Sequence, residues 1–185
     1  EDPALARAST LPGETCERLR AYLRQGGPAN AYAFLQSAAR LIGRDCGEPD
    51  APVPIAEAGL YLPGRDRPGL ADLRASWLEG RPVALIVFYR ALLIAGTLEA
   101  VDAMIAALQA RGLNVAAVHV RALREPFAKD WLAGTLPEVA PDVILNATSF
   151  AAASVAGDNR VPSVLELADC RVTALDARGA NLIGQ

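Results

Sequence analysis

The chain has 185 residues, of which 52% are hydrophobic, and a formal net charge of −3 at neutral pH. This length suits one domain, or one domain with an additional smaller unit, and the hydrophobic fraction excludes a disordered chain. The nearly balanced charge argues against a nucleic-acid partner or a polybasic membrane anchor. No apolar run reaches the roughly 20 residues of a bilayer span, so we expect no transmembrane helix.

The few metal-binding and redox-active residues narrow the chemistry further. Cys16, Cys46 and Cys170 are odd in number and widely spaced, which favours free thiols over a disulfide framework or a zinc ribbon. His119 is the single histidine, so a multi-histidine metal site is excluded and we expect no bound metal. Free thiols and the lack of a signal-peptide pattern at the first residues predict a cytoplasmic protein.

Apolar spacing in the first third predicts two helices, over residues 14–25 and 29–42. A Gly-Gly-Pro sequence at 26–28 ends the first helix, because glycine favours the position after a helix and proline cannot continue it. Gly43 ends the second. Two helices joined by so short a turn form a helical hairpin, to which we assign residues 1–45.

The composition then changes to a stretch rich in proline and glycine, which breaks any long helix. Within it, residues 58–64 are expected to form a short strand that runs into a turn. A third helix is predicted over residues 70–78. We therefore interpret residues 46–79 as a connection with a short helix.

From residue 80 onward, continuous apolar runs typical of strands buried on both faces alternate with helical patterns. Strands are predicted over 83–88, 115–120 and 142–147, with a fourth over 170–175, and helices over 98–111, capped by Thr97, and 126–136. Two consecutive strand–helix–strand units give a parallel sheet with helices on both faces. Residues 80–185 thus predict an α/β domain with a doubly wound, mainly parallel sheet, flavodoxin-like or periplasmic-binding-like.

In such a sheet, ligands bind beyond the carboxyl ends of the strands, near the point where the strand order reverses. Polar residues follow the predicted strands, and residues 91–96 after the first strand form a loop longer than packing requires. A guanidinium offers a planar fork that matches a carboxylate, so these ends suit a ligand with carboxylate or amide groups. The candidate ligand-binding residues are Tyr89, Arg90, Arg121, Asn146, Thr148 and Ser149.

A simpler interpretation of the same residues stays open. Arg90 and Arg121 would then form surface ion pairs, and Asn146 would satisfy the end of its strand. His119 lies inside the second strand without a second histidine or a close cysteine pair, which favours a packed side chain over a metal ligand.

Several nucleotide and catalytic motifs are missing from the sequence. The only lysine, Lys129, lies outside any glycine-rich loop, so there is no phosphate-binding P-loop. Neither a dinucleotide fingerprint nor a G-x-S-x-G nucleophile elbow is present. The residues alone therefore predict a ligand-binding or subunit-contact domain in which the catalytic residues are unknown.

Four stretches carry a specific resemblance. They are Y-L-R-Q-G-G-P-A-N (22–30), A-G-L-Y-L-P-G (58–64), G-R-P-V-A-L-I-V-F-Y-R-A-L-L-I-A-G-T (80–97) and the pair of segments at 101–115 and 141–151. In this order, over about residues 20–152, the chain resembles the N-terminal region of the large subunit of the cobaltochelatase and magnesium chelatase family. F-Y-R-A-L-L-I-A-G-T favours the cobalt branch.

The resemblance implies a tetrapyrrole-binding subunit of which this chain is a fragment. In this family the large subunit inserts the metal, and partner subunits of the AAA+ type hydrolyse ATP, in accord with the missing P-loop. The implied reaction is insertion of Co²⁺ into hydrogenobyrinic acid a,c-diamide in cobalamin biosynthesis. The fragment itself is expected to bind no cofactor and to be inactive alone. Residues 170–185 do not follow the family pattern.

Two alternatives remain. The first is the large subunit of a magnesium chelatase, which would prefer a porphyrin. The second is a non-catalytic α/β module that only docks a partner, with the hairpin at 14–43 as the contact surface.

Overall fold

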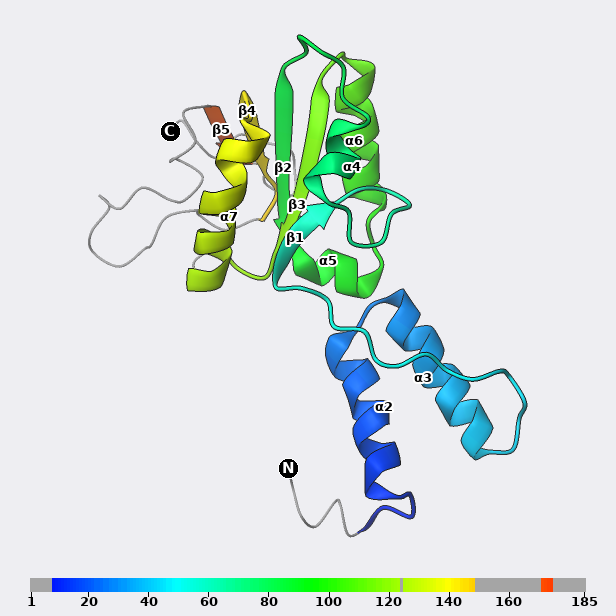
Figure 1. Cartoon of the computed structure of the whole chain (residues 1–185). Coiled ribbons are helices and arrows are strands. Elements are labelled where there is room, and N and C mark those ends of the chain that lie inside the picture. Colours follow the sequence, from blue (N-terminus) through cyan, green and yellow to red (C-terminus); the bar gives the residue numbers. More distant parts are fainter. Residues whose placement is uncertain (1–7, 124, 149–170, 175–185) are drawn as a thin grey trace. The chain divides into compact units, whose positions relative to one another are not determined.

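A computed structural model describes residues 8–123, 125–148 and 171–174 (Figure 1). The chain divides into two compact units. Residues 1–55 with 94–96 form the first, here the helical unit, and residues 56–93 with 97–185 form the second, here the α/β unit. The first boundary, at residue 55, lies within the stretch 46–79 that the sequence suggests as a connection. No helix in the described part of the chain is both long and apolar enough to cross a membrane.

The helical unit contains the predicted hairpin, which the structure confirms. Helix α2 (Gly13–Gln25) is followed after a two-residue turn by α3 (Pro28–Leu41). Both turn residues, Gly26 and Gly27, have positive φ angles of 67° and 86°, which side chains disfavour. A Cβ at Gly26 would also collide with Ile94, so this turn requires glycine.

Polar side chains tie the segment after the hairpin to its helices. The Asn30 Nδ2 group donates to the carbonyls of Gly26 and Val53 at 2.7 and 2.8 Å, and its Oδ1 accepts from the Val53 N–H at 2.9 Å. The buried Tyr22 hydroxyl donates to the Asp50 carbonyl. These bonds satisfy backbone groups of a segment that has no helix or strand of its own.

The α/β unit alternates strands and helices, as the sequence predicts. Its elements are β1 (Ala58–Tyr61), α4 (Leu70–Arg74), β2 (Val83–Tyr89), the start of α5 (Arg90–Ala95), α6 (Glu99–Ala110), β3 (Asn114–Val120), α7 (Pro126–Val139), β4 (Val143–Asn146) and β5 (Arg171–Ala174). The three strands predicted over 83–88, 115–120 and 142–147 are confirmed to within a residue at each end.

The strands form one sheet in the order β1-β3-β2-β4-β5. All neighbours are parallel except β1, which runs antiparallel to β3 at one edge. The register aligns Phe88 with His119 and Val87 with Asn146. Because the chain passes from β2 to β3 on one side and then returns to β4 on the other, the strand order reverses between β2 and β4.

Helices α6 and α7 cover opposite faces of this sheet. Alternate residues of β2 point to each face, so Leu85 and Val87 pack in the cluster that contains α7, and Ile86 and Phe88 pack in the cluster that contains α6. All four side chains are almost fully buried. A strand that is apolar on both faces explains the continuous run that predicts β2.

Two helix predictions were wrong in their extent. The helix expected over 70–78 ends at Arg74, because the backbone N–H of Leu78 donates to Asn114 Oδ1 at 2.9 Å and the Trp77 indole donates to the Val115 carbonyl at 3.2 Å. These bonds fix the segment against β3 in a non-helical form. The helix expected to end at 136 continues through Pro137 to Val139, whose side chain is buried.

Two further local predictions were wrong near the end of β2. Residues 91–96, expected as a loop, mostly belong to helix α5, a run of good helix formers that stops before Gly96 at φ 70°. Thr97 does not cap the next helix: Leu98 occupies the N-cap position of α6, with no side-chain cap. The helix propensity of these residues therefore explains why the segment after β2 is a helix and not a loop.

Candidate functional site

The reversal of strand order defines the candidate site. Tyr89 is the last residue of β2 and Arg90 the first of α5, while Asn146 ends β4 on the other side of the reversal. Arg121 directly follows β3, the neighbour of β2 on the opposite side. Because the strands are parallel, these four predicted residues lie at the carboxyl ends of the strands, here called the edge of the sheet, where α/β folds bind ligands (Figure 1).

Asn146 and Thr148 form a closed pair at the end of β4. The Asn146 Oδ1 accepts from the Thr148 hydroxyl at 2.7 Å and from its backbone N–H at 3.1 Å. Their side chains are 2% and 1% exposed. The next N–H, of Ala147, donates to the Val87 carbonyl at 2.8 Å. Asn146 therefore closes its strand end, as the simpler interpretation holds, and presents little surface.

Arg121 lies at the rim of this edge and forms ion pairs. Its guanidinium is 3.4 Å from a Glu57 carboxylate oxygen and 3.5 Å from one of Glu125. All three side chains are largely exposed, so each pair contributes little to stability. The simpler interpretation of Arg121 as a surface ion-pair residue therefore also describes its present contacts.

Arg90 and His119 form an association that the sequence reasoning missed. The His119 ring is 5% exposed and lies 6.3 Å from the Phe88 ring, with no hydrogen-bond partner for Nδ1 within the described residues. Burial, and then the positive charge of Arg90, lowers the pKa of His119 to about 4. The imidazole is thus neutral at pH 7. The register of β2 against β3 places His119 opposite Phe88, two residues before Arg90, and no pattern in the sequence alone signals this proximity.

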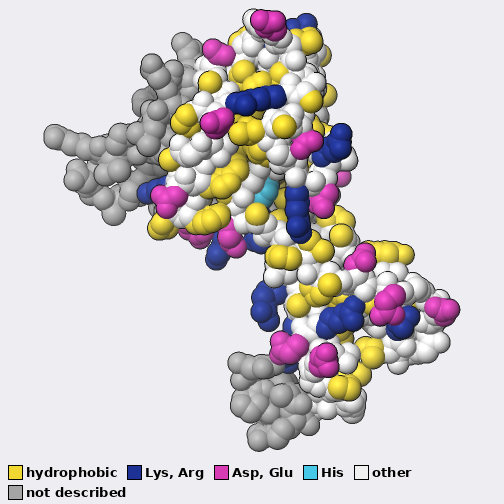
Figure 2. Space-filling model, in the orientation of Figure 1, with side chains coloured by type: hydrophobic (Ala, Val, Ile, Leu, Met, Phe, Trp, Pro, Cys, Tyr) yellow, Lys and Arg dark blue, Asp and Glu magenta, His cyan; other side chains and the backbone are white. Residues whose placement is uncertain are grey.

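Glycine at position 59 leaves space for this histidine. An ideal Cβ at Gly59 on β1 would lie only 2.7 Å from His119 Nε2. In the space-filling view the histidine, in cyan, shows a small surface among hydrophobic side chains (Figure 2). His119 therefore packs as a core residue, in agreement with the favoured sequence interpretation.

Strand β1 contributes a further polar pair on the face of the sheet that α6 covers, the same face as His119. The Tyr61 hydroxyl donates to Asp102 Oδ1 on α6 at 2.7 Å, and its ring meets Phe88 edge-on at 5.6 Å. Burial, reinforced by Asp102, raises the pKa of Tyr61 above its ordinary value. The hydroxyl therefore stays protonated and acts as a donor rather than a base.

Two expectations remain, the role of Ser149 in ligand binding and the lack of a bound metal. Ser149 lies outside the described residues, so its position relative to Thr148 is not assigned. Within the described ranges, no three histidine, cysteine, aspartate or glutamate residues come close enough together to hold a metal ion. The predicted residues that stay accessible within the described part of this edge are the half-buried Tyr89 and Arg90 and the exposed Arg121.

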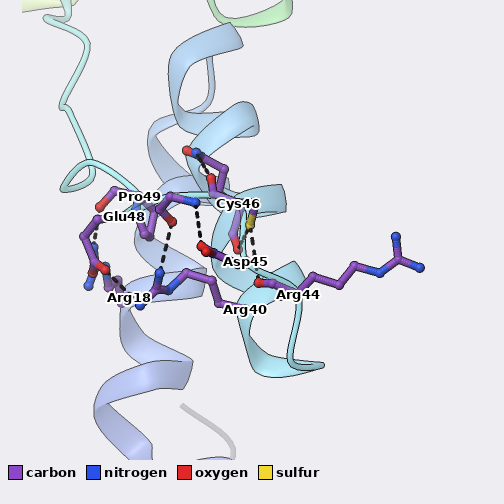
Figure 3. Close-up of polar contacts among 9 residues, drawn as sticks. Arg18, Arg40, Arg44, Asp45, Cys46, Glu48 and Pro49 are labelled. Carbon is purple, nitrogen blue, oxygen red and sulfur yellow. Dashed lines mark hydrogen bonds and ion pairs between the residues drawn. The ribbon is translucent and has the colours of Figure 1, made fainter.

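The helical unit has a separate hollow, of about 280 Å³, among α2, α3 and the segment that follows. Figure 3 shows its charged residues: Arg40 pairs with Glu48 at 2.9 Å, and Arg18 donates to the Pro49 carbonyl at 2.8 Å. Each arginine thus already holds part of the chain after the hairpin. We therefore interpret Arg18 and Arg40 as structural residues that hold the segment after the hairpin against α2 and α3.

Comparison with known proteins gives the chain its relatives. A family model described as CobN/Magnesium Chelatase matches residues 20–179. An aerobic cobaltochelatase subunit CobN from Sinorhizobium sp is 37% identical over an alignment of 174 residues, and the match covers 89% of this chain and 13% of the relative. The CobN subunit from Pseudomonas aeruginosa is 34% identical over 153 residues, 81% of this chain and 12% of the relative.

A solved structure supports the fold. The catalytic subunit of cobaltochelatase from Mycobacterium tuberculosis matches with a TM-score of 0.65 and 24% identity, over 94% of this chain and 14% of that one. At this identity the likeness concerns the fold. The chain spans about an eighth of the length of the curated relatives. Because the family model covers most of its residues, this chain belongs to the CobN/magnesium chelatase family.

Proposed function

We propose that this chain is the N-terminal part of the large, tetrapyrrole-binding subunit of an aerobic cobaltochelatase. That enzyme inserts Co²⁺ into hydrogenobyrinic acid a,c-diamide during cobalamin biosynthesis. The supporting observation is the match to two curated relatives, both named aerobic cobaltochelatase subunit CobN, over more than four-fifths of the chain. The family also includes magnesium chelatases, so preference for a porphyrin is the result that would favour the other branch.

The role proposed for the edge of the sheet is recognition of the tetrapyrrole side chains. Arg90 offers a planar donor fork for a carboxylate or an amide oxygen, and Tyr89 lies beside it at the end of β2. Thr148 follows β4 across the reversal, Ser149 is the next residue in the sequence, and Arg121 supplies a cation at the rim. Metal insertion also requires loss of two pyrrolic protons, and we assign no residue of this chain to that step.

ATP hydrolysis belongs, in this proposal, to separate AAA+ partner subunits. The chain has no P-loop and its only lysine, Lys129, lies in α7. The chain alone should therefore neither hydrolyse ATP nor insert cobalt, and the complete complex would assemble in the cytoplasm.

A titration tests the proposal. The purified 185-residue chain is titrated with hydrogenobyrinic acid a,c-diamide while the corrinoid absorbance is followed, and a porphyrin serves as the control ligand. Saturable binding that favours the corrinoid supports the proposal. Preference for the porphyrin would move the chain to the magnesium branch, and no binding of either ligand would reject the edge as a tetrapyrrole site.

A matched pair of variants localises any binding. Arg90→Ala should weaken corrinoid affinity by about 1–3 kcal/mol, because a charge-assisted hydrogen bond at a half-buried position is lost. Arg111→Ala is the control: it removes an exposed arginine after α6, near the amino end of β3. Equal affinities for the two variants would remove Arg90 from the site.

A further inference from the structure

Helix α3 has a second apolar stripe, opposite the side that it buries within the hairpin. Tyr32, Leu35 and Ile42 are 66%, 64% and 72% exposed. At 100° per residue, and with Ile42 counted although it is the C-cap residue of α3, they fall within a sector about 80° wide, roughly 180° from the buried Asn30 and Ala33. The stripe therefore lies on a separate face of the helix.

The composition of α3 is unusual for a helix covered on one side only. It has one charged residue, Arg40, among 14, whereas the 13-residue α2 has two glutamates and three arginines. A helix with so few charges around its circumference is typical of burial on more than one face. The exposed large apolar side chains of the described residues also gather in the helical unit, at Leu11, Leu23, Tyr32, Leu35, Leu41 and Ile42, against Leu78 and Phe127 elsewhere.

The spacing of the stripe indicates the shape of what covers it. Tyr32, Leu35, Ala39 and Ile42 are separated by three, four and three residues, the pattern of a helix–helix seam. The small Ala39 between larger neighbours leaves room for a side chain of a facing helix. The complementary surface is therefore the apolar face of another helix.

We propose that this stripe is covered by a helix from the rest of the large subunit. The inference rests on the proposed function, which makes this chain part of a longer polypeptide. In the curated relatives, the segment that matches this chain is 13% and 12% of the whole, so most of the subunit lies outside it. A helix on the same polypeptide has an effective concentration in the millimolar range, which favours it over a second copy or a separate subunit.

Cysteine accessibility tests this interface. Leu35→Cys places a thiol in the stripe, and Phe127→Cys places one at an exposed position of α7 as the control. Each variant is made in the 185-residue chain and in a Sinorhizobium CobN subunit whose matching segment is replaced by this chain. Alkylation is read peptide by peptide by mass spectrometry, which separates the new thiols from Cys16, Cys46 and Cys170.

We expect both thiols to react rapidly in the chain alone. In the large subunit, Leu35→Cys should react at least about tenfold more slowly, while Phe127→Cys keeps its rate. Equal slowing at both positions, or none at Leu35→Cys, would overturn the proposal. The alkylation experiment contains no tetrapyrrole. Its failure would therefore reject the helix contact only, whereas a failed corrinoid titration would reject the tetrapyrrole site.

A second measurement needs no replacement of segments. By sedimentation equilibrium the chain should be monomeric, and a Tyr32→Ser/Ile42→Ser variant should be monomeric with the same thermal unfolding. A dimer that this variant abolishes would show that a second copy covers the stripe and would overturn the proposal.

Discussion

The two units of this chain are stabilised in different ways. In the α/β unit, β2 and β3 consist almost entirely of buried apolar residues, packed on both sides by helices. In the helical unit, the described residues contribute only Tyr22 and Ala33 as buried apolar side chains. Side-chain bonds from residues such as Asn30 and Arg18 to backbone carbonyls hold it together instead.

This difference has consequences for stability. Apolar burial contributes about 25 cal/mol for each Å² removed from water, whereas a typical hydrogen bond contributes a net of about 1 kcal/mol. The helical unit should therefore open locally before the sheet does, and its amides should exchange faster. Four substitutions or conditions sharpen this comparison.

The largest effect is expected in the core of the sheet. Phe88→Ala should lower the free energy of unfolding of the α/β unit by about 3–5 kcal/mol, because the ring is fully buried between Tyr61 and His119. Urea denaturation followed by circular dichroism measures the change. Phe127→Ala, at an exposed position, is the control; a similar loss there would contradict the assignment of the core.

A polar substitution should act on the helical unit alone. Asn30→Ala removes three hydrogen bonds to partly buried backbone groups of Gly26 and Val53, at a cost of about 2–3 kcal/mol. Hydrogen exchange of α3 amides should become faster while that of β2 stays unchanged. Gln36→Ala, which loses a single bond to the Cys46 carbonyl, should have a smaller effect. Faster exchange in β2 would show that the two units open together.

The contact between Gly59 and His119 tests packing at the edge of the sheet. Gly59→Ala should lower the free energy of unfolding by about 1–3 kcal/mol, since the new methyl group meets the imidazole. In a His119→Ala background this cost should vanish, which a double-mutant cycle measures. A cost that persists without the ring would place its origin in the backbone of β1.

The last expected effect depends on pH and concerns the α/β unit only, because the chain has no other histidine. The pKa of His119 is about 4 in the folded chain and about 6.5 in the unfolded one, so the unfolded state binds more protons between these values. Stability should therefore fall by roughly 2–3 kcal/mol as the pH falls from 6.5 to 4, because each unit of pKa difference corresponds to about 1.4 kcal/mol. His119→Phe should reduce this slope, and an unchanged slope would assign it to carboxylates.

The sequence predicted the parts of the fold that depend on local patterns. The β-branched runs predicted the three central strands, and the parallel arrangement expected of them placed Tyr89, Arg90 and Asn146 at the carboxyl ends of two of these strands. The Gly-Gly-Pro turn gave the hairpin. In each case the residues that determine the element lie within the element or next to it.

Long-range contacts could not be predicted in this way. The antiparallel pairing of β1 with β3 brings Tyr61 to Asp102 and Gly59 to His119, across separations of 41 and 60 residues. The early end of α4 also depends on a distant residue, because Asn114 on β3 accepts a hydrogen bond from the N–H of Leu78, 36 residues earlier in the chain. The closed pair of Asn146 and Thr148 also depends on three-dimensional packing, which an amide side chain in a sequence does not reveal.

The short helix α5 has a consequence for how this protein can be divided. Its residues up to Leu93 belong to the α/β unit, whereas Ile94–Gly96 belong to the helical unit, where the Gly27 N–H donates to the Ile94 carbonyl at 2.8 Å. A recombination event or a protease acting at residue 55 would thus leave three residues of the helical unit behind. Exchange of the hairpin alone would therefore remove the partner of the Gly27 N–H, so the hairpin depends on the sequence that follows β2.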